Sequence, residues 1–368
     1  MTSILNFNAS DFMVERPSES SSGQQNYYKC NPKLSKAEDG HYRAVIKVIY
    51  NPHNFMKSLV ERQVYSMTDE NGWFSVVSSL SNNDTNCPIF KAWKSLRYSK
   101  DPVKENWAAP EAKGGTGWFN KKSERWVTIQ VIEDENQPEL VGRYLFWKLP
   151  ATIWRMIEAK QNPSPESGKA AIPVFDFLIG RAIELDVTPG PDDPSDPSRK
   201  NREIKYDLSS LSEDPVQCIN TDGTPLLNDE QQAVVDEYLD AMRKVWKARS
   251  ADKRNELMSQ VQNSDCYKKL SAFYDTEVIE KIKADCGNVY EELSYKPWDD
   301  ATAARVNAWL AKVTKGIDPT TVTITESADP LTPSSVDTEQ TVTVTTATSS
   351  LAPKSVDESL DEDTELPF

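Results

Sequence analysis

Histidine and closely spaced cysteine are almost absent from this 368-residue sequence, which has two histidines and five cysteines. No two cysteines form the short-spaced pair of a zinc or redox site, so we expect free thiols, no disulfide framework, no metal and no cofactor. A nucleophile elbow, a paired-carboxylate motif and a phosphate-binding loop are also missing; Gly114, Gly115 and Gly117 lack the Lys-Ser/Thr that follows such a loop. These absences predict a binding protein rather than an enzyme such as a metal nuclease.

Long apolar runs are absent as well. No stretch approaches the roughly 18 apolar residues that a membrane-spanning helix needs. The first residues contain neither the basic nor the apolar region of a secretory signal. We therefore expect a soluble, cytoplasmic chain with no membrane partner.

Positive charge is scarce overall, because the formal net charge is −15, but it is unevenly distributed. Residues 317–368 hold eleven acids and one base, whereas residues 91–131 hold nine bases and four acids. A basic middle followed by an acidic end is typical of a nucleic-acid-binding region with an attached interaction tail.

The most informative stretch lies between residues 117 and 154. Residues 125–132 alternate between two faces in the manner of a strand, a polar tip at 133–139 reads as a hairpin loop, and residues 143–147 read as the returning strand. A short helix carrying Trp154 follows. Trp and Tyr stand beside Lys and Arg in both strands, and a surface that stacks bases and neutralises phosphates combines these residue types.

The rest of the chain alternates short strands and turns before it becomes helical. We expect an α+β protein in which five strands form a small closed barrel of the OB type, with inserted helices. The expected strands are 42–50, 55–66, 73–80, the hairpin above, a strand within 173–187 and a basic strand at 199–208; a helix is expected at 87–97 and a mobile flap at 99–117. Helices are expected near 228–246, 251–262, 266–284 and 299–312.

The expected domain division follows from these elements. It consists of an amino-terminal arm (1–40), a core (41–215), a helical subdomain (216–315) and a disordered linker with an acidic tail (316–368).

Several short motifs occur in a recognisable order. They are AlaValIleLysVal (44–48), AsnGlyTrpPhe (71–74), the basic–aromatic hairpin with its helix (121–132 and 145–154) and TyrAspLeuSer (206–209). Over residues 40–210 the chain resembles the single-stranded DNA-binding proteins of T-even-like bacteriophages. The resemblance implies an OB-fold that binds single-stranded DNA during replication, recombination and repair in the cytoplasm of the host cell. It also implies an acidic tail that recruits replication or recombination proteins.

Two features depart from that family. Its structural zinc uses one His and three Cys, but here Cys87 stands alone, and a single thiolate cannot hold tetrahedral zinc. Its basic amino-terminal motif for cooperative binding is also missing, since residues 1–28 contain one base, Arg16. Self-association remains an open expectation, and the resemblance does not account for the helical block at 228–312.

The candidate DNA contacts combine the residue pattern with the resemblance. They are Lys47, Trp73, Trp118, Phe119, Lys121, Lys122, Arg125, Trp126, Arg143, Trp147, Lys148, Lys205 and Tyr206. Charge runs are usually solvated turns and tryptophans are usually core, so these alternatives stay open, most of all for Trp126 and for Trp154. A protein-interaction or phage structural protein with an aromatic core, and an RNA binder, are the alternative functions.

The carboxyl terminus resembles the acidic tip of bacterial single-stranded DNA-binding proteins. Its apolar end and free carboxylate could enter a basic pocket of a partner protein. The candidate partner-binding residues are Asp361, Glu362, Asp363, Glu365, Leu366, Pro367 and Phe368. A tail that only improves solubility is the alternative.

Overall fold

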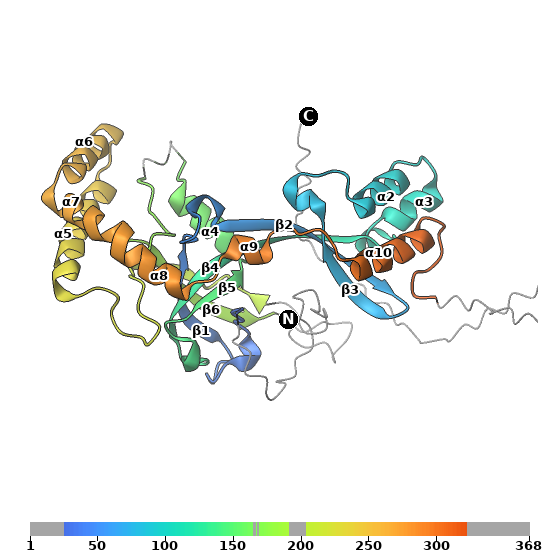
Figure 1. The fold of residues 1–368 in the computed structure, drawn as a ribbon, viewed down its shortest axis with the longest axis horizontal. Helices are drawn as coiled ribbons and strands as arrows, with labels where there is room; N and C mark the ends of the chain where they lie inside the picture. Colours follow the sequence, from blue (N-terminus) through green and yellow to red (C-terminus); the bar gives the residue numbers. More distant parts are fainter. Residues whose placement is uncertain (1–25, 165–166, 168, 191–203, 322–368) are drawn as a thin grey trace, which may run out of the picture.

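The computed structural model describes residues 26–164, 167, 169–190 and 204–321, and it consists of two lobes joined by two long strands (Figure 1). The strands are β1 (Tyr42–Ile49), β2 (Leu59–Asp69), β3 (Gly72–Val77), β4 (Asn120–Asp134), β5 (Tyr144–Lys148), β6 (Arg181–Pro189), β7 (Ile204–Lys205) and β8 (Ser210–Pro215). They form one antiparallel sheet in the order β3-β2-β4-β1-β6-β7, with β5 paired to β4 and β8 paired to β6. The α+β class is therefore confirmed.

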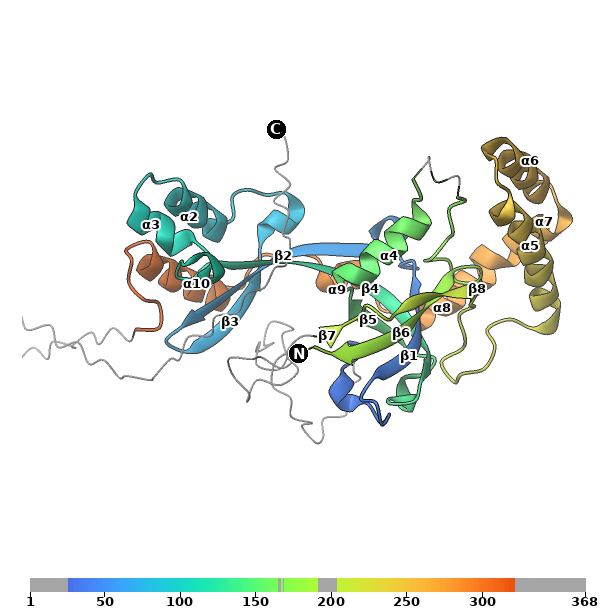
Figure 2. The same cartoon turned by 180° about the vertical axis from the view of Figure 1, so that it is seen from behind.

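The helices surround this sheet and extend well beyond it (Figures 1 and 2). They are α2 (Pro88–Arg97), α3 (Pro102–Ala108), α4 (Ala151–Gln161), α5 (Asp229–Lys247), α6 (Ala251–Gln262), α7 (Asp265–Phe273), the π-helical turn η7 (Tyr274–Val278), α8 (Ile279–Asp285), α9 (Val289–Leu293) and α10 (Asp300–Val313). Short 3-10 turns are η1 (Pro32–Leu34), η2 (Phe55–Lys57), η3 (Ser79–Asn82), η4 (Glu111–Lys113) and η5 (Pro138–Leu140). Within the described residues, no helix is long and apolar enough to cross a membrane.

The first lobe, which we call the sheet lobe, contains β1, β5, β6, β8, α4 and the second half of β4. Its core is built from the inward-facing side chains of these strands, such as Ile46, Ile129 and Ile183, and from Ile153 and Ile157 of α4. Strand β5 pairs with β4 on one side and makes a single bridge to Tyr27 on the other. Among the described residues, closure of the sheet into the expected five-stranded barrel is not shown.

The end of the expected amino-terminal arm belongs to this core. Tyr28 is buried, and its hydroxyl donates a hydrogen bond to Asp134 at 2.7 Å. Cys30 is also buried and lies 3.5 Å from the Tyr206 hydroxyl. An arm extending to residue 40 is thus too long, because these tyrosine and cysteine side chains fill space against β1 and β4. Residues 1–25 lie outside the described part.

The second lobe, which we call the distal lobe, contains β3, α2, α3, α10 and the ends of β2 and β4 that pair beside them. Its core includes Tyr65, Phe74, Ile89 and Trp309, and Cys87 is buried among these apolar side chains. The mobile flap expected at 99–117 is wrong in its first half, where α3 forms. Asp101 caps this helix by accepting a hydrogen bond from the Val103 backbone N–H, and Pro102 occupies the first turn.

The carboxyl-terminal helices do not form one subdomain. Helices α5 to α8 pack together and against Phe177 and Leu178 of the sheet lobe. Helix α9, which the sequence did not predict, packs on Val60 and Trp126, and α10 joins the distal lobe. Residues 216–315 therefore run along the whole molecule, as Figure 1 shows in yellow to red. In place of a basic strand at 199–208, the described part has the two-residue β7, and β8 was not expected.

Candidate nucleic-acid interface

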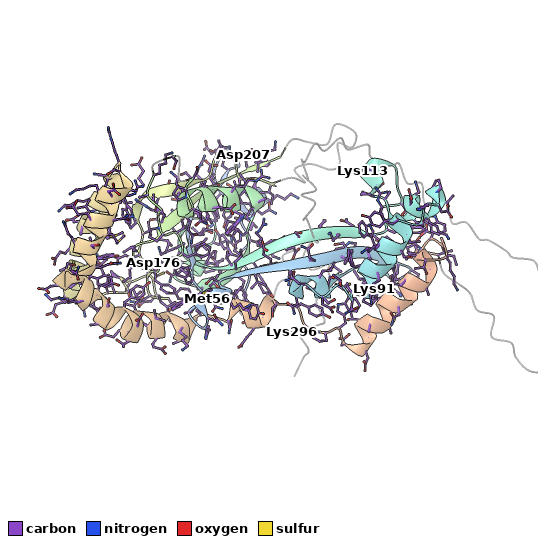
Figure 3. The ribbon with its side chains drawn as sticks, turned by 90° about the horizontal axis from the view of Figure 1, so that it is seen from above. Met56, Lys91, Lys113, Asp176, Asp207 and Lys296 are labelled. Carbon is purple, nitrogen blue, oxygen red and sulfur yellow. The ribbon has the colours of Figure 1, made fainter. Side chains whose placement is uncertain are left out.

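Two paired strands connect the lobes, and the segment between α9 and α10 also passes from one lobe to the other (Figure 1). Residues 60–65 of β2 pair with residues 121–126 of β4, with Glu61 opposite Arg125 and Tyr65 opposite Lys121. We call this pair of segments the bridge. Seen from above, the two ribbons cross the space between the lobes side by side (Figure 3). The bridge carries the largest group of the predicted contact residues.

Adjacent bridge residues point to opposite faces, because side chains alternate along a strand. Lys122 lies on the same face as Glu124 and Trp126, whereas Lys121 lies on the other face with Arg125. The cationic side chains predicted as one cluster are thus divided between two faces. We call them the Lys122 face and the Lys121 face.

A three-residue ion network occupies the Lys122 face. The Glu124 carboxylate accepts hydrogen bonds from Arg62 Nε at 2.9 Å, from Lys148 Nζ at 2.6 Å and from Trp126 Nε1 at 3.1 Å. Burial opposes ionisation of Glu124, but the charges of Arg62 and Lys148 and the hydrogen bonds outweigh it, so the pKa of Glu124 lies below its ordinary value. The carboxylate is therefore ionised at neutral pH and neutralises part of this surface.

The Lys121 face carries a separate ion pair. Arg125 Nε donates to Glu61 Oε1 at 2.7 Å, and the guanidinium lies 5.7 Å from the centre of the half-buried Trp154 ring. The exposed Glu61 makes this a surface pair that contributes little to stability. Arg125 can consequently exchange Glu61 for another anion at small cost.

Lys121 and Lys122 are exposed and form no ion pair within the described part of the chain. The bridge with Lys148 thus carries five cations, Arg62, Lys121, Lys122, Arg125 and Lys148, against two carboxylates, Glu61 and Glu124. A phosphate backbone crossing here would meet a net positive surface.

Four predicted contacts are buried instead. Lys47 has no exposed surface, and its Nζ donates to the Gly180 carbonyl at 2.9 Å. It lies on the face of β1 opposite Ile46 and Val48, and the segment containing Gly180 covers that face. Trp126 is 5 % exposed, Trp147 2 % and Phe119 8 %, so none of these rings offers a face to a base. The alternating sequence pattern of a strand does not reveal that other segments of the protein cover both of its faces.

Trp73 and Trp118 belong to the distal lobe. Trp73 is 39 % exposed, and both rings line a pocket of about 250 Å³ in the distal lobe. The charged side chains of this pocket are Glu111 and Asp318, and no Lys or Arg lines it. Asn120, which directly precedes Lys121, also lines the pocket, so the two indoles lie beyond the distal end of the bridge and not on it.

The remaining predicted residues are not brought to the bridge or fall outside the described residues. Arg143 precedes β5 at the end of the hairpin far from the bridge, and its carbonyl accepts a hydrogen bond from the Val131 N–H. Lys205 is exposed on β7, opposite Thr188, and Tyr206 packs its half-buried ring on Trp147. The tail residues at 361–368 lie beyond the described part.

The sequence analysis did not identify Arg62 or the two bridge carboxylates, Glu61 and Glu124, as part of this site. Arg62 lies 4.9 Å from the centre of the Trp126 ring, which Tyr27 contacts edge-on at 5.6 Å. A cross-strand register would have paired Arg62 with Glu124, but only the structure supplies that register.

Comparison with known protein families finds no family model that matches this chain. A search of curated proteins also finds no match. In the described residues, no group of three or more His, Cys, Asp or Glu side chains is arranged to hold a metal ion.

Proposed function

We propose that this chain binds single-stranded DNA, largely independently of sequence, by placing its phosphates along the bridge. The observation that carries this proposal is the pair of exposed lysines, Lys121 and Lys122, which have no carboxylate partner in the described part of a connection that already has excess positive charge. Lysine neutralises phosphate as a point charge and releases bound counterions, so binding should weaken steeply as salt rises.

Base stacking has a smaller part in this proposal than the sequence indicated. Trp154 on the Lys121 face and Tyr27 on the Lys122 face are half-buried rings next to Arg125 and Trp126. Each can offer an edge or part of a face to a base. Stacking on fully exposed aromatic rings contributes roughly 1–3 kcal/mol per base, and partly covered rings would contribute less.

The wider proposal follows the resemblance given by the sequence. The sheet lobe would be an OB-type barrel without zinc and without catalytic activity, acting in DNA replication, recombination and repair in the host-cell cytoplasm. The acidic tail would recruit replication or recombination proteins. The support is the sequence order of the motifs, the antiparallel sheet and the basic bridge.

A matched pair of double variants tests this proposal. Lys121→Ala/Lys122→Ala should weaken binding to a fluorescent oligo-dT and reduce the slope of log K against log salt by about 0.7 for each of the two lysines that contacts a phosphate. Lys268→Ala/Lys269→Ala is the control, since it removes another exposed Lys-Lys pair, from α7, where Lys268 lies 3.6 Å from Asp265, and gives the same charge change. Equal effects of both variants would contradict a specific role of the bridge.

A protein-interaction role is the second candidate, and the burial of Trp126 and Trp147 favours it. These rings stabilise the fold whether or not a nucleic acid binds. Absence of salt-sensitive oligo-dT binding by the unmodified protein would favour this candidate. A parallel titration with oligo-U would identify an RNA binder, since stacking and phosphate contacts tolerate both polymers.

A further inference from the structure

The pocket of the distal lobe has aromatic walls. Its volume is about 250 Å³, and Trp73, Trp118 and Trp309 line it. Trp309 is buried, and its Nε1 donates to the Thr68 carbonyl at 3.1 Å. The Nε1 atoms of Trp73 and Trp118 donate no hydrogen bond within the described residues. The pocket therefore offers indole rings together with two unused N–H donors.

Two carboxylates line this pocket and form no ion pair within the described part of the chain. Glu111, on η4, packs over Gly117, where a Cβ atom would lie 3.7 Å from Glu111 Oε2. Asp318 Oδ1 accepts hydrogen bonds from the Thr320 backbone N–H at 2.9 Å and from Thr320 Oγ1 at 2.7 Å. These contacts leave Asp318 Oδ2 and the Glu111 carboxylate as acceptors for an N–H group of a ligand.

The segment that carries Asp318 is held in place by α10. Lys312 Nζ donates to Pro319 O at 3.3 Å and to Thr321 O at 2.9 Å. The same atom pairs with the Glu70 carboxylate at 2.6 Å, at the turn between β2 and β3. Pro319 is buried. This wall of the pocket is therefore part of the folded lobe, and the amine behind it is already paired.

Strand register places the pocket on the Lys122 face. Asn120 lies opposite Ser66, and Trp73 lies opposite Thr68. Residues directly opposite each other on neighbouring strands share a face, as do residues two apart on one strand. All four of these pocket residues therefore lie on the same side of the sheet as Lys122. The pocket continues the Lys122 face beyond the end of the bridge.

The lining favours one class of ligand. Exposed indole rings stack flat rings, and the absence of Lys and Arg from the lining disfavours a phosphate. The carboxylates favour an N–H donor on the ring edge. Cytosine presents an amino group at the position where thymine presents a carbonyl oxygen, and Asp or Glu accepting from cytosine N4 is a recurrent pairing in protein–DNA complexes. A carbonyl oxygen facing a carboxylate is repelled instead.

We propose that the pocket takes one base of a strand bound along the Lys122 face, and that it prefers a base with an exocyclic amino group to thymine. This inference rests on the proposed function, since the phosphates on that face would hold the base near the pocket. Trp73 would stack any base, and Glu111 and Asp318 would discriminate. A cationic side chain of a partner protein would also suit these groups, but the positive charge of the bridge opposes its approach and attracts a polyanion.

Deoxycytidine and deoxyuridine test the pocket without any phosphate, because their rings differ only where cytosine has its amino group and uracil has a carbonyl. The indole N–H signals in NMR spectra of the full-length chain, assigned with Trp73→Phe and Trp118→Phe, report on binding. We expect deoxycytidine to shift both signals at concentrations about fivefold lower than deoxyuridine. Equal responses, no response to either nucleoside, or a stronger response to arginine amide would overturn the proposal.

Oligo-dC and oligo-dT of equal length test the pocket within a bound strand. Glu111→Gln/Asp318→Asn keeps an acceptor for Thr320 and removes two negative charges. It should reduce the ratio of oligo-dC affinity to oligo-dT affinity by about three- to tenfold. Its affinity for oligo-dT should stay equal or rise, because like charge is removed from the path of the phosphates. An unchanged ratio would overturn the proposal.

The control is Asp222→Asn/Glu237→Gln, which makes the same charge change at two exposed residues outside the pocket. Asp222 Oδ1 accepts from the Thr224 N–H at 3.0 Å and from Thr224 Oγ1 at 2.6 Å, so its turn matches that of Asp318. The affinity ratio should not change in this variant, and a fall as large as that of the pocket variant would overturn the proposal.

Failure of the pocket and failure of the proposed function give different results. Salt-sensitive binding of oligo-dT with equal nucleoside responses would reject the pocket and leave the bridge proposal standing. A deoxycytidine response without binding of either oligonucleotide would reject DNA binding along the bridge and leave a nucleobase site in the distal lobe.

Discussion

Arg62 and Glu124 face each other across the two strands of the bridge and form a hydrogen-bonded ion pair, with 2.9 Å between Arg62 Nε and Glu124 Oε2. The second carboxylate oxygen of Glu124 accepts a hydrogen bond from Lys148. One acid thus restrains two cations on the Lys122 face. Any phosphate that binds there must compete with Glu124 for both of them.

Replacing Glu124 by Gln should raise the affinity for oligo-dT. Gln keeps an acceptor for Lys148 or Arg62 but removes the competing charge, so we expect a rise of roughly two- to fivefold, which corresponds to up to about 1 kcal/mol. Fluorescence anisotropy at several salt concentrations measures this effect, and the salt dependence should become steeper.

The control is Glu256→Gln on α6, where Glu256 pairs with the exposed Lys253. It makes the same change in net charge far from the bridge and should leave affinity almost unchanged. A fall in affinity for Glu124→Gln, or equal increases for both variants, would argue against DNA on the Lys122 face.

Much of the local structure was predictable because it follows from short-range patterns. Alternation predicted β1 and the long hairpin of β4 and β5, and helical spacing predicted α2, α6 and α10 to within a few residues. The placement of α10 was not predictable. Its Trp309 Nε1 donates to the Thr68 carbonyl 241 residues away, and no local pattern encodes that contact.

The candidate site was predictable only in part. Charge clustering identified Lys121 and Lys122, which the structure leaves exposed. The same reasoning failed for Lys47 and Trp126, because alternation assigns a face without showing what covers it. A segment near Gly180 covers Lys47, while Tyr27 and α9 cover Trp126, and all of these are distant in sequence.

The buried amine of Lys47 gives the protein a specific dependence on pH. Burial lowers the pKa of Lys47 to about 8, below the ordinary value of a lysine, while nearby Cys218 and Asp176 oppose the shift. Between pH 8 and the ordinary lysine pKa, the unfolded chain binds more protons than the folded chain, so this group makes stability rise with pH. The gain across that window is about 3 kcal/mol.

Lys47→Met removes this contribution. We expect the free energy of unfolding of the unmodified protein to increase relative to that of the variant as pH rises from about 8 toward 10.5. Urea denaturation of both proteins at several pH values measures the difference, and the comparison cancels the opposite effect of the buried tyrosines and thiols. A difference that stays constant with pH would show that Lys47 is not buried in solution.

The ion pair between Arg305 and Asp69 joins α10 to the end of β2 in the distal lobe. Its Nε and Nη2 donate to the two Asp69 oxygens at 2.6 and 2.8 Å, and the Arg305 hydrogen bonds hold the pKa of the buried Asp69 below its ordinary value. Arg305→Leu leaves that carboxylate unpaired and should cost about 2–3 kcal/mol at neutral pH in denaturant titrations. The loss should shrink as pH falls through the Asp69 pKa, because a protonated acid needs no partner.

The control is Arg243→Leu, which breaks exposed pairs with Asp214 and Asp240 and should cost under about 1 kcal/mol. Equal losses for both variants would mean that the Asp69 pair does not hold α10 in place.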